Sequence, residues 1–131
     1  MRIPTRIATA AALATVTAAT TLPAFPALAK GDDVVRRGAC SGTADWKLKA
    51  GPEDGRIEVE AEVDSNKSGQ VWTWRLLHNG TLSAKGSATT AGASGSFTVR
   101  RTVTNLAGDD HLRFRAVRTA TGEVCNGRLT F

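Results

Sequence analysis

The stretch Arg56–Asp64, Arg-Ile-Glu-Val-Glu-Ala-Glu-Val-Asp, decides the fold of this 131-residue chain. Apolar residues occupy every second position from Ile57 to Val63, and charged residues fill the positions between them. Because successive side chains of a strand point to opposite faces, this period of two separates an apolar face from a charged face. A helix would mix the two sets. The stretch therefore predicts a half-buried β-strand.

The same period recurs along the chain on both sides of this stretch, with turn residues between the runs. The dipeptide Asn79-Gly80 is the strongest turn signal, because a type I′ hairpin turn needs a positive φ at both positions. No stretch shows the 3.6-residue period of an amphipathic helix. The further predicted strands are residues 44–50, 70–78, 81–90, 96–104, 111–119 and 124–131.

Seven short strands predict an all-β chain, a seven-stranded antiparallel β-sandwich of the immunoglobulin or fibronectin III type. Residues 81–90 are small and predict an edge strand. Arg101 stands where the alternation requires an apolar residue, so we expect a β-bulge near Arg100-Arg101. Trp72 and Trp74 fall on the inner face and predict core packing. The alternative is an exposed platform for stacking sugars.

Residues 1–29 resemble a secretory signal. Two arginines open the stretch, an uncharged run follows, and two prolines precede a final Ala-Leu-Ala, which is a cleavage pattern. The prolines argue against the alternative of a membrane-spanning helix. We therefore expect a signal peptide over residues 1–29, a flexible N-terminal arm over 30–38 and a β-sandwich domain over 39–131. The expected location is extracellular, either free or at the cell wall, with no membrane contact after cleavage.

The charge balance excludes a strongly basic protein. Without Arg2 and Arg6, the 17 basic residues of the chain become 15 against 12 acidic ones, a net charge of +3. Such a balance is far from the basic tail or stripe of a nucleic-acid-binding protein, so we expect no nucleic acid partner.

Cys40 and Cys125 are the only cysteines. In an oxidising compartment an even pair is expected to form a disulfide. The alternative, two free reactive thiols, lacks the neighbouring histidine or CxxC spacing that activates such thiols. Closing a loop of about 85 residues would remove about 4–5 kcal/mol of unfolded-chain entropy. The sequence therefore predicts that one disulfide ties the two ends of the domain.

Short motifs spread over nearly the whole chain after residue 38 carry a resemblance to a known group of proteins. They are Cys40-Ser41-Gly42, Trp46-Lys47-Leu48-Lys49, Asp54-Gly55-Arg56-Ile57-Glu58-Val59, Gly69-Gln70-Val71-Trp72, Ser94-Gly95-Ser96-Phe97 and Thr121-Gly122-Glu123-Val124-Cys125. With these motifs the chain resembles a group of small secreted actinobacterial proteins of uncharacterised function. The resemblance implies secretion and a β fold, and it implies no activity.

Three stretches resemble parts of catalytic or metal sites, but each lacks something that such a site needs. Gly92–Ser96 resembles a nucleophile elbow, but its last residue is Ser where the elbow has Gly, and no helix is predicted after it. The glutamates of Arg56–Asp64 have the spacing of any polar strand face rather than that of two carboxylates flanking a cleft. Asp109-Asp110-His111 offers too few ligands for a metal ion. We therefore predict no enzyme, no catalytic residues, no metal and no cofactor.

One surface remains. In a sandwich of this type, the strands at residues 70–78, 111–119 and 124–131 share a sheet. Their outward positions hold four arginines and no carboxylate, which makes them a candidate anion-binding set. The four are Arg75, Arg113, Arg115 and Arg128.

These patterns predict a secreted, monomeric, non-catalytic binding module. Its arginine-rich sheet face would dock an anionic cell-wall or extracellular polymer, or an acidic protein. A simpler interpretation is a solvated basic face without a partner. A further alternative is a secreted inhibitor of an extracellular enzyme, acting through an exposed loop at Asn105–Asp110.

Overall fold

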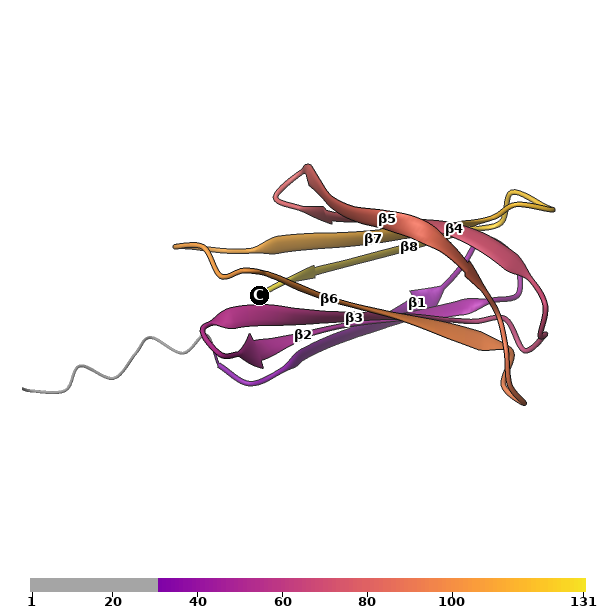
Figure 1. The fold of residues 1–131 in the computed structure, drawn as a ribbon, viewed down its shortest axis with the longest axis horizontal. Helices are drawn as coiled ribbons and strands as arrows, with labels where there is room; N and C mark the ends of the chain where they lie inside the picture. The colour runs from indigo at the N-terminus through magenta and orange to yellow at the C-terminus, as the bar shows by residue number, and fades with distance from the viewer. Residues whose placement is uncertain (1–30) are drawn as a thin grey trace, which may run out of the picture.

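The computed structural model describes residues 31–131, which form eight β-strands and no helix (Figure 1). The predicted signal peptide, residues 1–29, lies outside the described residues. Among residues 31–131 there is no helix that could cross a membrane. The strands are β1 (Val34–Ala39), β2 (Asp45–Glu53), β3 (Arg56–Asp64), β4 (Val71–His78), β5 (Thr81–Thr89), β6 (Ser96–Thr104), β7 (His111–Arg118) and β8 (Val124–Thr130).

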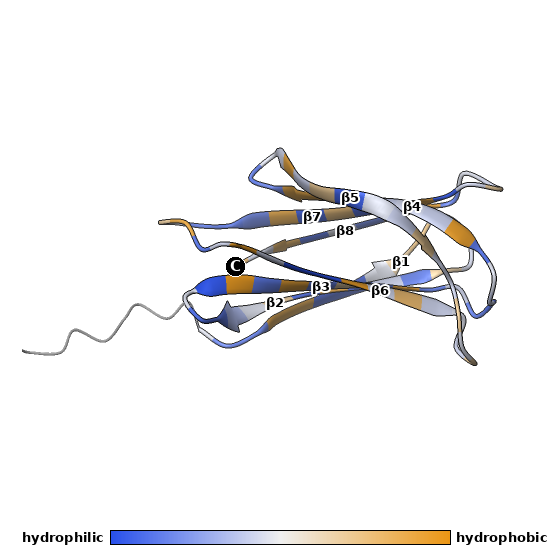
Figure 2. Cartoon of the chain, viewed as in Figure 1, coloured by the Kyte–Doolittle hydropathy of each residue, from blue (hydrophilic) through white to orange (hydrophobic). Residues whose placement is uncertain are grey.

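The strands form two four-stranded antiparallel sheets, with the orders β1-β2-β3-β6 and β5-β4-β7-β8. Figure 1 shows them as two layers, and Figure 2 shows hydrophilic and hydrophobic residues alternating along strands such as β3 and β7. The apolar side chains of both sheets belong to one common core. The prediction of an all-β chain built from antiparallel sheets is therefore confirmed.

The core is built around two tryptophans of β4. Trp72 is 0 % exposed and Trp74 is 4 % exposed, so their predicted core packing is confirmed. The Trp72 ring lies 6.4 Å from the ring of Phe97 in β6, between centroids. The Trp74 ring stacks at 6.2 Å on Phe114 of the neighbouring strand β7. Such pairs add to the large apolar area that aromatic side chains bury.

Trp46 of β2 packs against both sheets on the side where β1 and β8 lie. A Cβ atom built on Gly38 of β1 would lie 2.7 Å from the Trp46 ring, and one built on Gly127 of β8 would lie 2.8 Å from it. Real Cβ atoms do not come this close to a neighbouring atom. Glycine at both positions therefore makes room for the ring.

Trp74 is covered in a similar way on the side of β5 and β6. A Cβ atom on Gly86 would lie 2.8 Å from its ring, and the Arg101 guanidinium lies 5.0 Å from the ring centroid, a cation–π distance. The predicted bulge near Arg100-Arg101 is wrong, because β3 and β6 pair without a register shift and Arg101 stands opposite Val59. Arg101 points toward the other sheet although it is charged. It can do so because β6 is an edge strand, where the guanidinium contacts the Trp74 ring and still stays exposed to solvent.

The disulfide between Cys40 and Cys125 is present, with Cα atoms 4.3 Å apart, and this prediction is confirmed. Cys40 follows β1 directly and Cys125 lies in β8. Since β1 and β8 belong to different sheets, the bridge joins the two layers covalently.

The segment before Cys40 differs from its prediction. Instead of a flexible arm over residues 30–38, Val34–Ala39 forms β1 and pairs with β2 from Val34 opposite Ala50 to Ala39 opposite Asp45. The described residues thus form eight strands rather than the predicted seven. The physical reason is packing: Val34 lies against the core and Gly38 lies against the Trp46 ring, so β1 is held beside β2.

Candidate functional site

The four predicted arginines gather on the outer face of the sheet β5-β4-β7-β8. We call Arg75, Arg113, Arg115 and Arg128 the arginine face. Arg75 of β4 stands directly opposite Arg115 of β7, and Arg113 of β7 stands directly opposite Arg128 of β8. Their neighbours along the strands, such as Trp74 and Phe114, point into the core, so the arginines point outward. The prediction that these strands share a sheet is confirmed.

Lys85 of β5 extends this positive surface, and the sequence reasoning missed it. The turn at Asn79-Gly80 has the predicted positive φ values, 48° and 79°. Regular pairing from this turn onward would place Lys85 opposite Trp74 on the inner face. A register shift between Leu76 and Leu77 leaves Ser83 unpaired, so Lys85 stands opposite Arg75 instead. A bulge of this kind leaves no periodic signal in the sequence.

The charges of the arginine face are not neutralised. Arg113 donates from Nε to Oδ1 of Asn126, 2.9 Å away, a neutral partner. Within residues 31–131, no carboxylate lies within ion-pair distance of these arginines. No Asp or Glu occupies an outward position of β4, β5, β7 or β8. The sheet therefore presents an uncompensated positive potential.

The opposite sheet carries cations as well, but two of them have acidic partners. Arg100 pairs with Glu60 at 3.1 Å, and Lys49 pairs with Asp33 at 2.9 Å. The hydrogen bond to Asp33, and then the charge of that carboxylate, raise the pKa of Lys49 above its ordinary value. The two outer faces thus differ in charge balance, although each contains basic residues.

Two hollows indent the outer face of β5-β4-β7-β8. The first hollow, of about 570 Å³, is lined by Arg36, His111, Arg113 and Arg128 among others. The second hollow, of about 460 Å³, is lined by Arg75, Lys85 and Arg115 among others. Neither lining contains a carboxylate. Arg36 comes from β1 of the other sheet, and the sequence reasoning did not connect it with this face.

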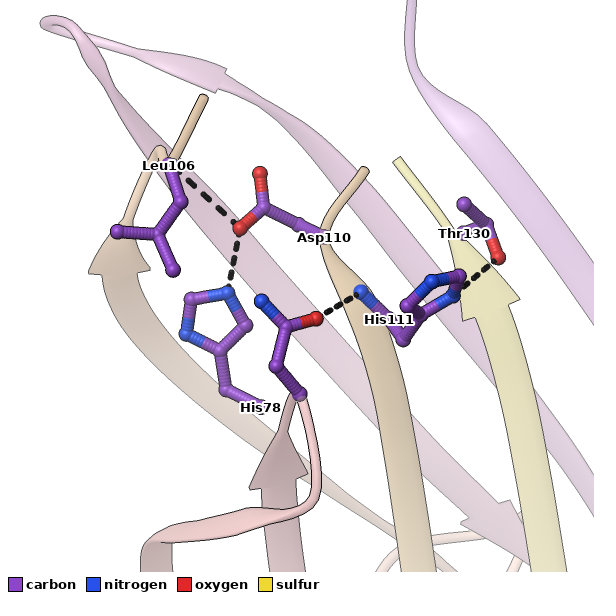
Figure 3. Close-up of polar contacts among 6 residues, drawn as sticks. His78, Leu106, Asp110, His111 and Thr130 are labelled. Atoms are coloured by element: carbon purple, nitrogen blue, oxygen red, sulfur yellow. Dashed lines mark hydrogen bonds and ion pairs between the residues drawn. The ribbon is translucent and has the colours of Figure 1, made fainter. Parts of the chain in front are cut away.

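His111 lies at one end of the first hollow. Its Nδ1 is 3.1 Å from Oγ1 of Thr130, and its backbone N–H donates to Oδ1 of Asn79 at 2.8 Å (Figure 3). These contacts fix the ring on the strand that also carries Arg113. His111 can therefore contribute a hydrogen bond to a bound anion.

The second histidine serves a structural contact that the sequence reasoning missed. Nε2 of His78 lies 2.5 Å from Oδ1 of Asp110, which is 0 % exposed, and the backbone N–H of Leu106 donates to the same oxygen at 3.4 Å (Figure 3). A buried carboxylate needs such partners. A signal did exist, because His78 has the inward parity of Trp72, Trp74 and Leu76, and an imidazole at that position needs a polar partner.

The stretch Asp109-Asp110-His111 does not assemble a metal site. Asp110 faces His78 whereas His111 faces Thr130, so their side chains do not converge (Figure 3). In the part of the chain that the structure describes, no group of three or more His, Cys, Asp or Glu side chains could hold an ion.

The stretch Gly92–Ser96 does not assemble a catalytic triad within the described residues. Oγ of Ser94 lies 2.9 Å from Oγ of Ser96, and the two histidines are engaged with Asp110 and Thr130. The arginine face is thus the strongest candidate site.

In comparisons with known proteins, no protein family, curated protein or solved structure matches the chain. The resemblance to small secreted actinobacterial proteins therefore stays a prediction.

Proposed function

We propose that this protein is a secreted, non-catalytic binding module that docks an anionic extracellular or cell-wall partner through the arginine face. One observation carries the proposal: four arginines meet in opposed pairs on one sheet face that has no carboxylate. Placing Arg75 opposite Arg115, and Arg113 opposite Arg128, disfavours the fold slightly, because like charges directly opposite each other repel. An anionic partner would convert this repulsion into attraction.

Secretion and the fold type belong to the same proposal. The signal-like residues 1–29 and the disulfide between Cys40 and Cys125 support an extracellular location. The strand orders β2-β3-β6 and β5-β4-β7-β8 support a fibronectin III-like or immunoglobulin-like sandwich, with β1 added at the edge.

The test compares two double variants that remove the same net charge. R113Q/R128Q removes an opposed pair from the arginine face, and K47Q/K49Q removes two lysines from the opposite sheet. On a phosphocellulose column, R113Q/R128Q is expected to elute at a clearly lower salt concentration than the wild type, whereas K47Q/K49Q elutes close to it. Both variants should stay folded, because none of the four side chains is buried, and charge changes at the surface alter stability by only a few tenths of a kcal/mol.

Equal losses of retention in the two variants would contradict the proposal, because net charge alone would then explain binding. Added salt gives an independent check, since exposed charges are screened beyond about 8 Å at physiological ionic strength.

A second candidate function rests on the loop Asn105–Asp110. Leu106 is 43 % exposed there, while its own backbone N–H is tied to the buried Asp110. An exposed apolar side chain on an anchored loop suits an inhibitor that inserts into an extracellular enzyme. If Leu106 rather than the arginines serves binding, Leu106→Ser would abolish partner capture and R113Q/R128Q would not.

A further inference from the structure

We propose that the outer face of β5-β4-β7-β8 binds a linear phosphate polymer across both hollows, so that recognition requires a chain rather than a single anion. This inference rests on the proposed function and adds to it the class of ligand. It starts from the division of the cations into two separate groups. Arg36, Arg113 and Arg128 line the first hollow, while Arg75, Lys85 and Arg115 line the second hollow.

The two hollows follow each other along β7. His111 and Arg113 line the first hollow, and Arg115 and Val117 line the second hollow. Equivalent positions are four residues apart, which corresponds to about 14 Å along a strand. A single phosphate ion cannot contact all six cations. A chain with phosphates at intervals can place one charged group in each hollow.

The type of donors favours phosphate over carboxylate. A carboxylate is planar and is satisfied by one bidentate guanidinium. Each hollow instead brings three cationic side chains around one space, and the first hollow adds His111 and Thr130. A phosphate group offers its charge in several directions, so several donors can bind it at once.

The face also lacks an exposed Phe or Trp ring on which sugars or bases could stack. The outward positions of β4, β5, β7 and β8 hold arginine, lysine, threonine, serine, valine, leucine, asparagine and His111, and no Phe or Trp. Trp74 lines the second hollow but is only 4 % exposed, so it offers little ring surface to a ligand. Binding of single-stranded nucleic acids depends on aromatic stacking of the bases. A ligand of this face is therefore held by its charges, as a phosphate polymer would be.

Two linked contacts bind more tightly than the same contacts made separately. Once one phosphate occupies the first hollow, the chain holds the next phosphates at a high effective concentration beside the second hollow. Affinity should therefore rise with chain length until the chain spans the two hollows. Tripolyphosphate is too short for this, whereas long-chain polyphosphate is long enough.

The experiment titrates the whole secreted protein with inorganic phosphate, tripolyphosphate and long-chain polyphosphate. Concentrations are counted in phosphate groups, because a long chain offers more binding positions per molecule. Calorimetry at fixed salt should show at least about tenfold tighter binding of the long chain than of tripolyphosphate. Either R75Q/R115Q or R113Q/R128Q should bring the long chain down to the affinity of tripolyphosphate. K47Q/K49Q is the matched control and should keep the wild-type length dependence. Unchanged melting temperatures establish that each variant is folded.

The outcomes separate the two levels of the proposal. If neither a phosphate probe nor polygalacturonate, a carboxylate chain, binds the wild type better than it binds both arginine variants, the proposed function itself is wrong. If the arginines matter but affinity at equal phosphate does not depend on chain length, the chain-spanning inference is wrong and the docking function stands. Equal binding of polygalacturonate would overturn the choice of phosphate.

Discussion

Replacing Gly127 by alanine tests whether Trp46 holds the two sheets together as closely as the structure shows. The added methyl group would lie 2.8 Å from the Trp46 ring. The ring cannot move away freely, because Gly38 of β1 confines it as well, with a Cβ distance of 2.7 Å. Alanine at Gly127 should therefore force the sheets or the ring to shift.

Two opposing effects set the expected magnitude. Inserting a methyl group into a well-packed interior costs about 1–3 kcal/mol. Alanine also restricts the unfolded chain more than glycine does, which offsets about 0.4–1 kcal/mol of that cost. We expect a net loss of about 1–2 kcal/mol in the free energy of unfolding. For a domain of this size, each kcal/mol lowers Tm by about 4–8 °C.

Urea and thermal unfolding followed by circular dichroism measure the effect. Gly31→Ala is the control, because a Cβ there meets nothing within 4 Å, and it should stay within about 0.5 kcal/mol of the wild type. In a Trp46→Leu background, Gly127→Ala should cost little, which gives a coupling energy of about 1 kcal/mol or more. An unchanged Tm for Gly127→Ala, or an equal cost in both backgrounds, would refute the reasoning.

Three further predictions concern stability. Reducing the Cys40–Cys125 bridge, which spans 85 residues, should lower the free energy of unfolding by about 4–5 kcal/mol. Urea titrations with dithiothreitol, compared with titrations without it, measure this loss. Alkylation of both thiols in the native protein before reduction would contradict the bridge. Trp74→Ala should cost about 3–5 kcal/mol, and the tryptophan emission of the wild type should resist quenching by iodide; ready quenching with little loss of stability would mean an exposed ring. The hydrogen bond with Glu58, and then the negative charge of Glu58, raise the pKa of Glu53. Ionisation of Glu53 therefore opposes folding. This penalty is absent below the pKa of a free glutamate, about 4.3, and is fully present above the raised pKa. Glu53→Gln should therefore stabilise the protein at neutral pH but not in acid, and a pH-independent effect would exclude this cause.

The features that depend on period and composition could be predicted from the sequence. The alternation in Arg56–Asp64 predicts β3 with its correct ends, because one face must enter the core. The same rule places Trp72 and Trp74 inside and the four arginines outside. The pairing of Cys40 with Cys125 follows from there being no other cysteine.

The features that depend on pairing between strands could not be predicted. Val34–Ala39 contains no alternation that marks it as a strand, and it becomes one because packing against the core and the Trp46 ring holds it beside β2. Arg101 breaks the apolar pattern without breaking the register, since its partner, the Trp74 ring, comes from the other sheet. The contact of His78 with Asp110 likewise joins residues 32 positions apart.

Ser83 is a single residue whose unpaired state sets the phase of a whole strand. Leu82, just before it, has the partner that the hairpin turn sets. Every later residue of β5 points to the opposite face from the one that regular pairing would give it. If Ser83 paired with Leu76, Lys85 would stand opposite Trp74, in the space beside the ring that only Gly86 can now occupy. The outer surface would then lose one positive charge. The unpaired Ser83 thus makes a tightly filled interior and a charged exterior compatible on the same strand. Its deletion should be tolerated, because Ala84 and Lys85 would reach the same partners without a bulge.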